Sequence, residues 1–364
     1  EIMNIAILVP TLSVGGAEKI AIETARGLAN QNNVVYLFVI SKKNTFFPVE
    51  DKVHVVYLNG FNKIFQFYKL LKLYKIEKCI SYLERANLLG LISCSLAKVD
   101  LCATVHTAPK SAFRNRPLIN RIFIYITYKL ISIMKHKVIC VSQGIKDDLY
   151  DLYGIENSIV IPNFVNLSDV PKRNNSGEVL YDYIFVGRIE PVKGCDILVE
   201  AFLSISDWVL KENVRIAIVG DGTDLDKIKS KIINSNISSN FTFFGKVGNP
   251  LKIMSESDTI IVPSYAEGFG LVVVEALLSG LKVIYSKCEF GPKEIIGSNF
   301  PEYNKLGFIS PLENEKKSIK ELALLIKESR KIERIPHEQV LGIIFREYSQ
   351  SVVCRKIASW IKDR

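Results

Sequence analysis

Three loops of the sequence combine glycines with charged side chains, and each lies between a predicted strand and a predicted helix. The first contains Gly15 and Gly16, the second carries Arg188 and Lys193, and the third runs over residues 264–271. In an open parallel sheet, ligands bind beyond the carboxyl ends of the strands, where the N-termini of helices present free backbone N–H groups. These three loops are therefore the candidates for ligand binding.

The third loop includes Glu267-Gly268-Phe269-Gly270-Leu271, and Glu275 follows in the helix predicted from Leu271. The glycines expose backbone N–H groups, and the helix dipole directs its positive end at the loop, so this segment predicts a phosphate site. Glu275 stands among Val and Ala, where an unpaired carboxylate is costly to bury, which favours an acceptor for ligand hydroxyls such as a ribose diol. Either glutamate could instead cap a helix or form a salt bridge, but two of them flanking a Gly-Phe-Gly turn favour a site.

The second loop places Arg188 and Lys193 five residues apart on a turn with Gly187 and Gly194 at its ends. An arginine offers a planar fork of donors and a lysine a point charge, a pair that suits a diphosphate. Two solvated surface cations are the alternative. Their position after the first predicted strand of the second half favours binding.

The first loop contains Gly15 and Gly16, which let the backbone approach a ligand closely. The spacing matches neither the dinucleotide-binding G-x-G-x-x-G nor the P-loop, so neither a nicotinamide nor an ATP site is indicated. A plain tight turn explains this loop equally well.

Strand and helix patterns alternate along the chain, which predicts a parallel α/β architecture. The polar, turn-rich stretch 166–177 interrupts the alternation and is typical of a linker. We therefore expect one domain over residues 1–166 and a second over 167–346. The amphipathic segment 347–364 is expected to form a helix that caps either half or packs back onto the first. The predicted strands are 4–10, 33–40, 53–57, 78–82, 100–105, 137–141, 181–186, 215–219, 241–244, 259–263 and 282–285.

Composition is consistent with two globular domains, because the 364 residues are 48% hydrophobic. The seven cysteines are scattered singly, without the spacing of a disulfide framework or a zinc site, so a reducing compartment is expected. The chain runs into a strand pattern at Asn4, and we expect no secretory signal. No apolar run reaches the roughly 20 residues of a spanning helix.

Positive charge is concentrated in the basic region, residues 58–137, which contains 14 Lys or Arg and three acidic residues in a chain of net charge +9. Such asymmetry predicts an anionic partner. Aromatic residues interleaved with Lys and Arg suit a lipid–water interface, whereas no nucleic-acid module is recognisable and nucleic acid is not expected as a partner. The alternative is a solvated basic face on helices whose apolar side belongs to the core.

Together, Glu267-x7-Glu275, Gly-Arg188-x4-Lys193-Gly and the Gly15-Gly16 loop resemble the retaining nucleotide-sugar glycosyltransferases of the group 1 and family 4 type. This family includes bacterial O-antigen, capsule and lipid-linked oligosaccharide transferases. The resemblance runs in register over nearly the whole chain. It implies the GT-B fold, in which two Rossmann-like β/α/β domains face each other across a cleft.

The resemblance also implies roles for individual residues. Arg188 and Lys193 would neutralise the diphosphate, and Glu275 would bind the ribose. The transferred sugar and the distal phosphate would be held by Glu267 and the backbone of Gly268, Phe269, Gly270 and Leu271. Val247 would lie near the base, and His106 matches the active-site histidine of the first half. The family needs no metal and no other cofactor.

The implied reaction moves a hexose or N-acetylhexosamine, most commonly from a UDP-sugar, to a membrane-associated, for example lipid-linked, glycan. We expect a peripheral enzyme on the cytoplasmic face of the inner membrane, docked on anionic lipid through the basic region. Two alternatives stay open: a non-hydrolysing nucleotide-sugar epimerase of the same fold, and a non-catalytic sugar-nucleotide-binding partner subunit. The intact set of Arg188, Lys193, Glu267 and Glu275 argues against the latter.

Overall fold

The structure is a computed structural model of the chain and describes residues 2–12, 15–42, 52–110, 117–167 and 179–363. It divides into two compact units, Glu1–Phe164 with Glu347–Arg364, and Val165–Arg346. The predicted division after residue 166 and the observed one after Phe164 differ by two residues. The predicted linker lies largely outside the described residues.

The first unit is built on a seven-stranded parallel sheet with the order β3-β2-β1-β4-β5-β6-β7. β1 occupies the centre, where Ala6 is paired with Tyr36 on one side and Cys79 on the other. Its residues from Ile5 to Val9 are buried on both faces, as expected for a central parallel strand. The strands are β1 Asn4–Val9, β2 Val34–Val39, β3 Val53–Tyr57, β4 Lys78–Tyr82, β5 Asp100–Val105, β6 Lys137–Cys140 and β7 Ser158–Val160.

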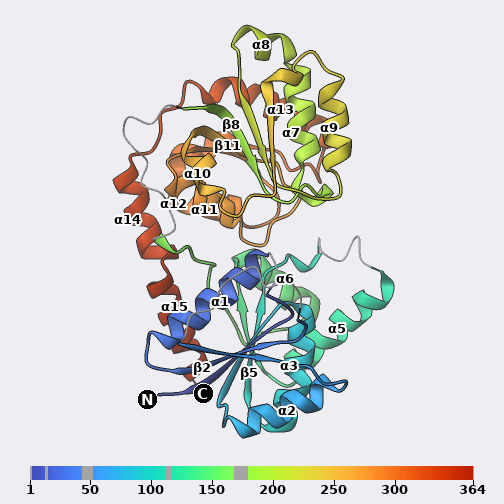
Figure 1. Cartoon of the computed structure of the whole chain (residues 1–364), viewed down its shortest axis with the longest axis vertical. Coiled ribbons are helices and arrows are strands. Elements are labelled where there is room, and N and C mark those ends of the chain that lie inside the picture. The colour runs from blue at the N-terminus through green and yellow to red at the C-terminus, as the bar shows by residue number, and fades with distance from the viewer. Residues whose placement is uncertain (1, 13–14, 43–51, 111–116, 168–178, 364) are drawn as a thin grey trace. The chain divides into compact units, whose positions relative to one another are not determined.

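Helices cover both faces of this sheet (Figure 1). One layer contains α1 (Gly16–Ala29) packed against α15 (Gln350–Lys362). In the other layer α2 (Lys63–Leu73) packs on α3 (Glu84–Ala97), and α3 packs on α5 (Leu118–Ile133). The remaining helix between β6 and β7 is α6, Gln143–Tyr153.

The last helix of the chain belongs to the first unit. The amide of Gln350 donates to the Glu23 carbonyl of α1 at 2.8 Å. At the other end of α15, Lys137 Nζ donates to the Trp360 carbonyl at 2.6 Å and lies 5.0 Å from the centre of that indole ring. Buried side chains along the helix, such as Val353 and Ile357, complete the apolar layer over α1.

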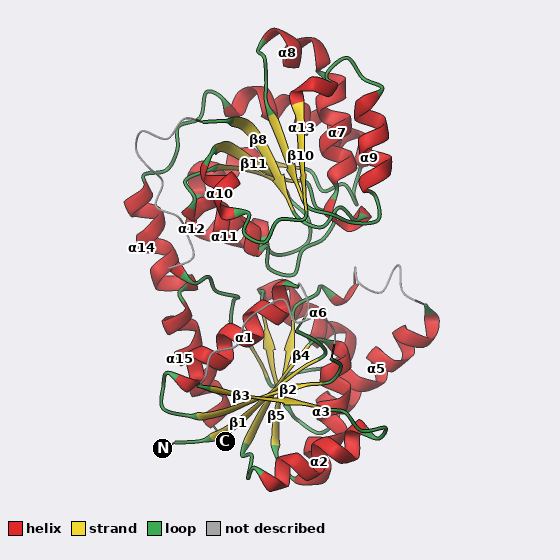
Figure 2. Ribbon diagram, in the orientation of Figure 1, coloured by secondary structure: helices red, strands yellow, loops and turns green. Residues whose placement is uncertain are grey.

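The second unit is a six-stranded parallel sheet with the order β10-β9-β8-β11-β12-β13, flanked by helices (Figure 2). Its strands are β8 Tyr181–Val186, β9 Ile216–Val219, β10 Phe241–Gly245, β11 Ser257–Val262, β12 Lys282–Ser286 and β13 Gly307–Phe308. Its helices are α7 Cys195–Ser204, α8 Ser206–Lys211, α9 Leu225–Ile233, α10 Leu251–Ser255, α11 Leu271–Leu278, α12 Pro292–Asn299, α13 Glu315–Ser329 and α14 His337–Tyr348. In both units all strands are parallel, so two Rossmann-like α/β domains are confirmed.

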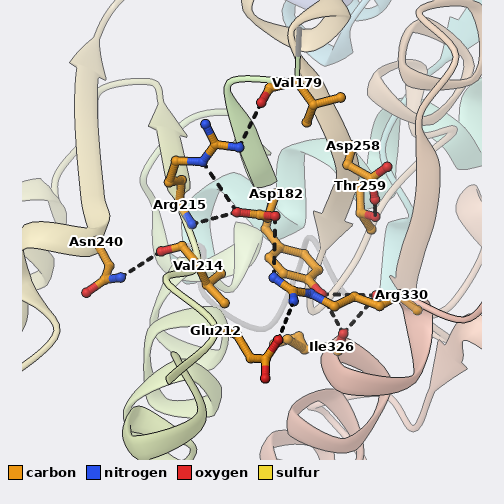
Figure 3. Close-up of polar contacts among 12 residues, drawn as sticks. Val179, Asp182, Glu212, Val214, Arg215, Asn240, Asp258, Thr259, Ile326 and Arg330 are labelled. Carbon is orange, nitrogen blue, oxygen red and sulfur yellow. Dashed lines mark hydrogen bonds and ion pairs between the residues drawn. The ribbon is translucent and has the colours of Figure 1, made fainter. Parts of the chain in front are cut away.

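An ion-pair cluster holds the amino ends of the strands in the second unit (Figure 3). Arg330 contacts Glu212 at 3.0 Å and Asp182, in β8, at 3.4 Å. Asp182 also accepts the backbone N–H of Arg215 at 2.8 Å, just before β9. This cluster fixes strand register at the amino edge of the sheet, opposite the carboxyl edge where the glycine-rich loops lie.

Candidate functional site

The third glycine-rich loop joins β11 to α11 and is folded tightly. Gly270, the residue before α11, has φ +86°, in the left-handed region that favours glycine. A Cβ on Gly291, whose φ is +51°, would lie 2.5 Å from the carbonyl oxygen of Phe269. The Phe269 side chain is buried beneath the loop. The loop therefore directs the N-terminus of α11 outward while its one large apolar side chain anchors it.

Glu267 in this loop is a buried carboxylate with two donors on one oxygen. Lys193 Nζ lies 2.7 Å from Glu267 Oε1, and Ser264 Oγ donates to the same oxygen at 2.7 Å. The Glu267 side chain is 9% exposed, and Ser264 is buried. In the described part of the chain both bonds go to Oε1 and none to Oε2. The carboxylate is thus held in one orientation through Oε1.

The second glycine-rich loop packs directly on the third. It contains the 3-10 turn η2 (Pro191–Lys193), whose Val192 carbonyl accepts the backbone N–H of Tyr265 at 2.9 Å. Gly194 has φ +67°, and a Cβ there would lie 2.0 Å from the Pro263 carbonyl oxygen. Only glycine allows this approach of the two backbones, which brings Lys193 to Glu267.

Arg188, at the carboxyl end of β8, makes a different ion pair. Its guanidinium lies 2.8 Å from Glu190 Oε2, and the side chain is 66% exposed. The two predicted cations of this loop therefore have separate carboxylate partners, Glu190 for Arg188 and Glu267 for Lys193. Their convergence on a single anion stays a prediction, and it requires Arg188 to turn from Glu190 toward the ligand.

Glu275 is the fifth residue of α11 and is half-buried. Leu271, one helical turn before it on the same side of α11, is half-buried as well. The carboxylate is thus less deeply buried than its Val and Ala neighbours suggest, because it lies on the stripe of α11 that faces away from the core. Val247 follows β10 in a loop and is also half-buried. The ribose role of Glu275 and the base role of Val247 stay predictions.

Sequence reasoning placed Ser264 in the third loop without giving it a role, and it missed a second acidic group beside the loop. Tyr265 Oη donates to Glu315 Oε2 at 3.2 Å. Burial raises the pKa of the Tyr265 hydroxyl, and Asp196 and Glu315 raise it further. Burial likewise raises the pKa of Asp196, in the first turn of α7. The role of Ser264 could have been found from its place three residues before Glu267, whereas Glu315 comes from α13, which no local pattern links to the loop.

In the first unit, Gly15 and Gly16 lie at the start of α1. Gly15 is the N-cap with extended backbone, φ −166°, and a Cβ there would meet Glu18 Oε2 at 2.1 Å. Gly16 is exposed and has open space where a Cβ would be. The Glu18 carboxylate therefore folds back over Gly15, and Gly16 is the glycine of this pair that leaves open space at the amino end of α1.

His106 follows β5 directly and is neutral at physiological pH. Its ring stacks on Tyr82, with centroids 5.3 Å apart, and burial lowers its pKa to about 4. The Thr104 hydroxyl donates its single hydrogen to the Ser81 carbonyl, so the 3.0 Å contact between Thr104 Oγ1 and His106 Nε2 must be donated by the ring. Nε2 then carries the proton. The buried Nδ1, which has no hydrogen-bond partner among the described residues, presents a lone pair.

The described residues supply neither a metal-binding cluster nor a membrane-spanning helix. They contain no group of three or more His, Cys, Asp or Glu side chains that could hold a metal ion. None of the helices in this part of the chain combines the length and apolar character needed to cross a bilayer.

Comparison with known proteins matches the two halves of the chain to two families. Residues 14–169 match the model of Glycosyltransferase Family 4, and residues 168–339 match Glycosyl transferases group 1. A similar solved structure is Anabaena HepE in complex with UDP, with TM-score 0.76 and 19% identity over 98% of this chain and 99% of that one. WaaG, a glycosyltransferase involved in lipopolysaccharide biosynthesis, has TM-score 0.74 and 15% identity over 99% and 100% of the two chains.

Several curated relatives are glycosyltransferases from bacteria. A Campylobacter jejuni GalNAc-alpha-(1->4)-GalNAc-alpha-(1->3)-diNAcBac-PP-undecaprenol alpha-1,4-N-acetyl-D-galactosaminyltransferase is 25% identical over 82% of this chain and 83% of its own. An Escherichia coli UDP-Gal:alpha-D-GlcNAc-diphosphoundecaprenol alpha-1,3-galactosyltransferase is 25% identical over 77% of each chain. A Staphylococcus aureus poly(ribitol-phosphate) alpha-N-acetylglucosaminyltransferase is 28% identical over 47% of this chain, which spans 33% of that relative. The chain is therefore a glycosyltransferase with the GT-B fold, formed by a family 4 amino-terminal half and a group 1 carboxy-terminal half.

Proposed function

We propose that this enzyme transfers a hexose or N-acetylhexosamine from a UDP-sugar, with retention of configuration, to a membrane-associated glycan such as a lipid-linked oligosaccharide. The observation that carries the proposal is Glu267, whose Oε1 is held by Lys193 and Ser264 at 2.7 Å each. This arrangement fixes a carboxylate at the start of α11, beside backbone N–H groups that suit a phosphate. A sugar hydroxyl and a phosphate are the two groups that a nucleotide sugar presents there together.

The proposed mechanism is electrostatic. When the anomeric C–O bond breaks, the electron pair stays on the diphosphate, and negative charge grows on the leaving oxygen. Lys193, Arg188 and the N-terminus of α11 are the groups of the second unit that would stabilise this charge. One preorganised donor of this kind typically lowers the activation free energy by about 2.7–4 kcal/mol. These positive groups would take the part that Mg²⁺ plays in other transferases, so we propose that the reaction needs no metal.

Recognition of the donor would be divided among the remaining residues. Glu275 would accept the ribose hydroxyls and Val247 would contact the base. Glu267 Oε2 would accept from a hydroxyl of the transferred sugar. His106, which is neutral, would lie beside the transferred sugar without adding positive charge. Gly15 and Gly16 would let the amino end of α1 approach the substrate.

Support for the acceptor class comes from the names of relatives and from charge. Two curated relatives act, by their names, on undecaprenol-linked diphosphate sugars, and HepE was solved with UDP. The basic region gives the first unit an excess of positive charge, and anionic lipid attracts positive charge. We therefore place the enzyme on the cytoplasmic face of the inner membrane as a peripheral protein.

A thermal-shift series tests the donor site. UDP and UDP-sugars should stabilise the protein, by about 2.7 kcal/mol at a hundredfold excess over Kd, whereas ADP and GDP should have a smaller effect. Glu275→Gln should abolish most of the UDP response. A matched control is Glu200→Gln, because Glu200 lies in the same unit and pairs with Lys231, away from the loops. The assignment fails if no uridine nucleotide stabilises the protein, or if Glu275→Gln responds like the wild type. Interconversion of the UDP-sugar without any acceptor would instead indicate an epimerase.

A further inference from the structure

The segment that follows β12 lies alongside the third glycine-rich loop in the second unit. Glu289 forms an isolated parallel bridge with Ala266. A Cβ on Gly291 would lie 3.0 Å from the Cβ of Glu267. The helices that follow the loop and the segment, α11 and α12, also contact each other. The backbone around Glu267 is therefore packed against the connection that leaves a neighbouring strand.

A hydrogen bond between two serines joins β12 to the third loop. Ser286, the last residue of β12, donates its hydroxyl hydrogen to the carbonyl of Ser264. Ser264 in turn donates its own hydroxyl hydrogen to Glu267 Oε1 at 2.7 Å. Ser286 is 0% exposed and Ser264 is 1% exposed. Two consecutive buried hydrogen bonds therefore connect the end of β12 with the Glu267 carboxylate.

The sheet fixes the position of Ser286. β12 is paired with β11 on one side and with β13 on the other, where Ser286 is the register partner of Phe308. The backbone N–H of Lys287, the next residue, donates to the Phe308 carbonyl at 2.8 Å. A side chain on a strand positions a group more precisely than one on a loop. Ser286 therefore anchors the main chain of Ser264 to the most rigid element beside it.

Burial makes the hydroxyl of Ser286 difficult to replace. Without it, the Ser264 carbonyl would lose this donor in a place closed to water, and an unsatisfied buried acceptor is costly. A shift of the Ser264 backbone would lower that cost and would move the Ser264 hydroxyl away from Glu267. The neighbouring Cys288 is 0% exposed, and burial raises the pKa of its thiol to about 12, so it supplies no charge that could hold the carboxylate instead.

We propose that Ser286 is a positioning residue for recognition of the transferred sugar, and that it acts through Ser264 to orient the Glu267 carboxylate. This inference rests on the proposed role of Glu267 as the acceptor for a sugar hydroxyl, and it deepens that role. Lys193 attracts the same carboxylate oxygen as a point charge on a flexible stem, which contributes energy but little direction. The hydroxyl of Ser264, bonded from a fixed main chain, contributes the direction. Sugars that differ in one hydroxyl can be distinguished only by a carboxylate of defined orientation.

Calorimetric titration with UDP and UDP-sugars tests the proposal. The probes are UDP, UDP-glucose, UDP-galactose, UDP-N-acetylglucosamine and UDP-N-acetylgalactosamine, and the UDP-sugar that wild type binds most tightly is used for the variants. Ser286→Ala should raise the Kd of that UDP-sugar by about 5- to 10-fold, the effect of one hydrogen bond, and should leave the Kd of UDP unchanged. A merely structural role would weaken the binding of UDP and of the UDP-sugar alike.

Ser257→Ala is the matched control. Ser257 begins β11, is 0% exposed and donates its hydroxyl hydrogen to the Ile253 carbonyl at 2.8 Å, at the amino end of the strand that leads to the third loop. Its replacement should change neither Kd. The double variant Ser264→Ala/Ser286→Ala should bind the UDP-sugar like Ser264→Ala alone, because Ser286 acts through the Ser264 hydroxyl. Ser286→Cys fills the same space with a weak S–H donor, so it should also weaken the UDP-sugar selectively if the alanine variant does not fold.

Three results would overturn the positioning role. They are a folded Ser286 variant with the UDP-sugar affinity of wild type, an equal loss of affinity for UDP and the UDP-sugar, and losses of the two serine variants that add in the double variant. Glu267→Gln separates this outcome from failure of the proposed function. A loss of UDP-sugar affinity in Glu267→Gln but not in Ser286→Ala refutes the positioning role alone. Wild type that binds none of the five nucleotides refutes the donor site itself.

Discussion

Replacement of Lys193 by methionine removes the cation of the Lys193–Glu267 pair and keeps much of the apolar stem. The free-energy cost follows from the burial of the two partners, 24% exposed for Lys193 and 9% for Glu267. Exposed pairs contribute about 0–1 kcal/mol and removal of one partner from a fully buried pair costs about 3–5 kcal/mol. A nearly buried carboxylate that keeps the hydrogen bond from Ser264 lies between these limits. We expect the free energy of unfolding to fall by about 2 kcal/mol, or roughly 4–8 °C in melting temperature.

The same substitution should affect transfer far more than folding. Loss of one preorganised donor to the departing diphosphate should reduce kcat/KM by about 10²- to 10³-fold. The assay is UDP release from the UDP-sugar in the presence of acceptor, at a temperature where circular dichroism shows the variant folded. Lys231→Met is the matched control, since Lys231 pairs with Glu200 in the same unit with both side chains more than a third exposed. Near-wild-type kcat/KM in folded Lys193→Met would refute the electrostatic role.

Two further predictions concern stability. His106 has its pKa lowered by burial from 6.5 to about 4, so the unfolded state binds more protons between these values and stability falls as the pH drops from about 6.5 to 4. His106→Asn should remove that part of the acid sensitivity, about 2 kcal/mol between pH 7 and pH 5, as measured by urea titrations at the two pH values. An unchanged pH dependence would contradict the neutral buried ring. Arg330→Met breaks the contacts to Asp182 and Glu212 and should cost about 1 kcal/mol with kcat/KM unchanged, because the cluster lies at the amino edge of the sheet. A large loss of transfer in that variant would show that the cluster is coupled to the site.

The parallel α/β architecture could be predicted from sequence because its strands are continuous apolar runs. β3, β4, β5 and β8 have the predicted bounds, and the other predicted strands differ by one or two residues at an end. β7 and β13 were not predicted. They have three and two residues, too few for a hydrophobic period to be visible, and each is paired on one side only, at an edge of its sheet.

The candidate site was predictable where its residues share one loop and not where they come from distant elements. Glu267, the glycines around Phe269 and the start of α11 follow one another in the chain, so their proximity is local. The Lys193–Glu267 contact spans 74 positions and depends on Gly194 fitting under the Pro263 carbonyl. The hydrophobic periodicity of a sequence does not show that two loops lie this close together. The separate pairing of Arg188 with Glu190 likewise depends on side-chain conformations that the sequence pattern does not contain.

The basic region shows a different limit of sequence reasoning. The interleaved aromatic and basic residues predicted an interface with lipid, and a solvated basic face was the less favoured alternative. In α5 the structure shows that apolar residues such as Ile122 and Ile126 are exposed, whereas Ile124 and Ile131 are buried. A helix pattern alone does not show which apolar side is the buried one.

The return of α15 to the first unit affects the order in which the enzyme can mature during synthesis. Val353, Cys354, Ile357 and Ile361 are buried core residues of a unit whose other parts end at Phe164. A nascent chain that has completed the first sheet still lacks this layer over α1, whereas Val165–Arg346 carries its own core in one continuous stretch. The unit made first is therefore completed last, after residues 350–362 have left the ribosome, and until then its uncovered α1 surface is an exposed apolar target for chaperones.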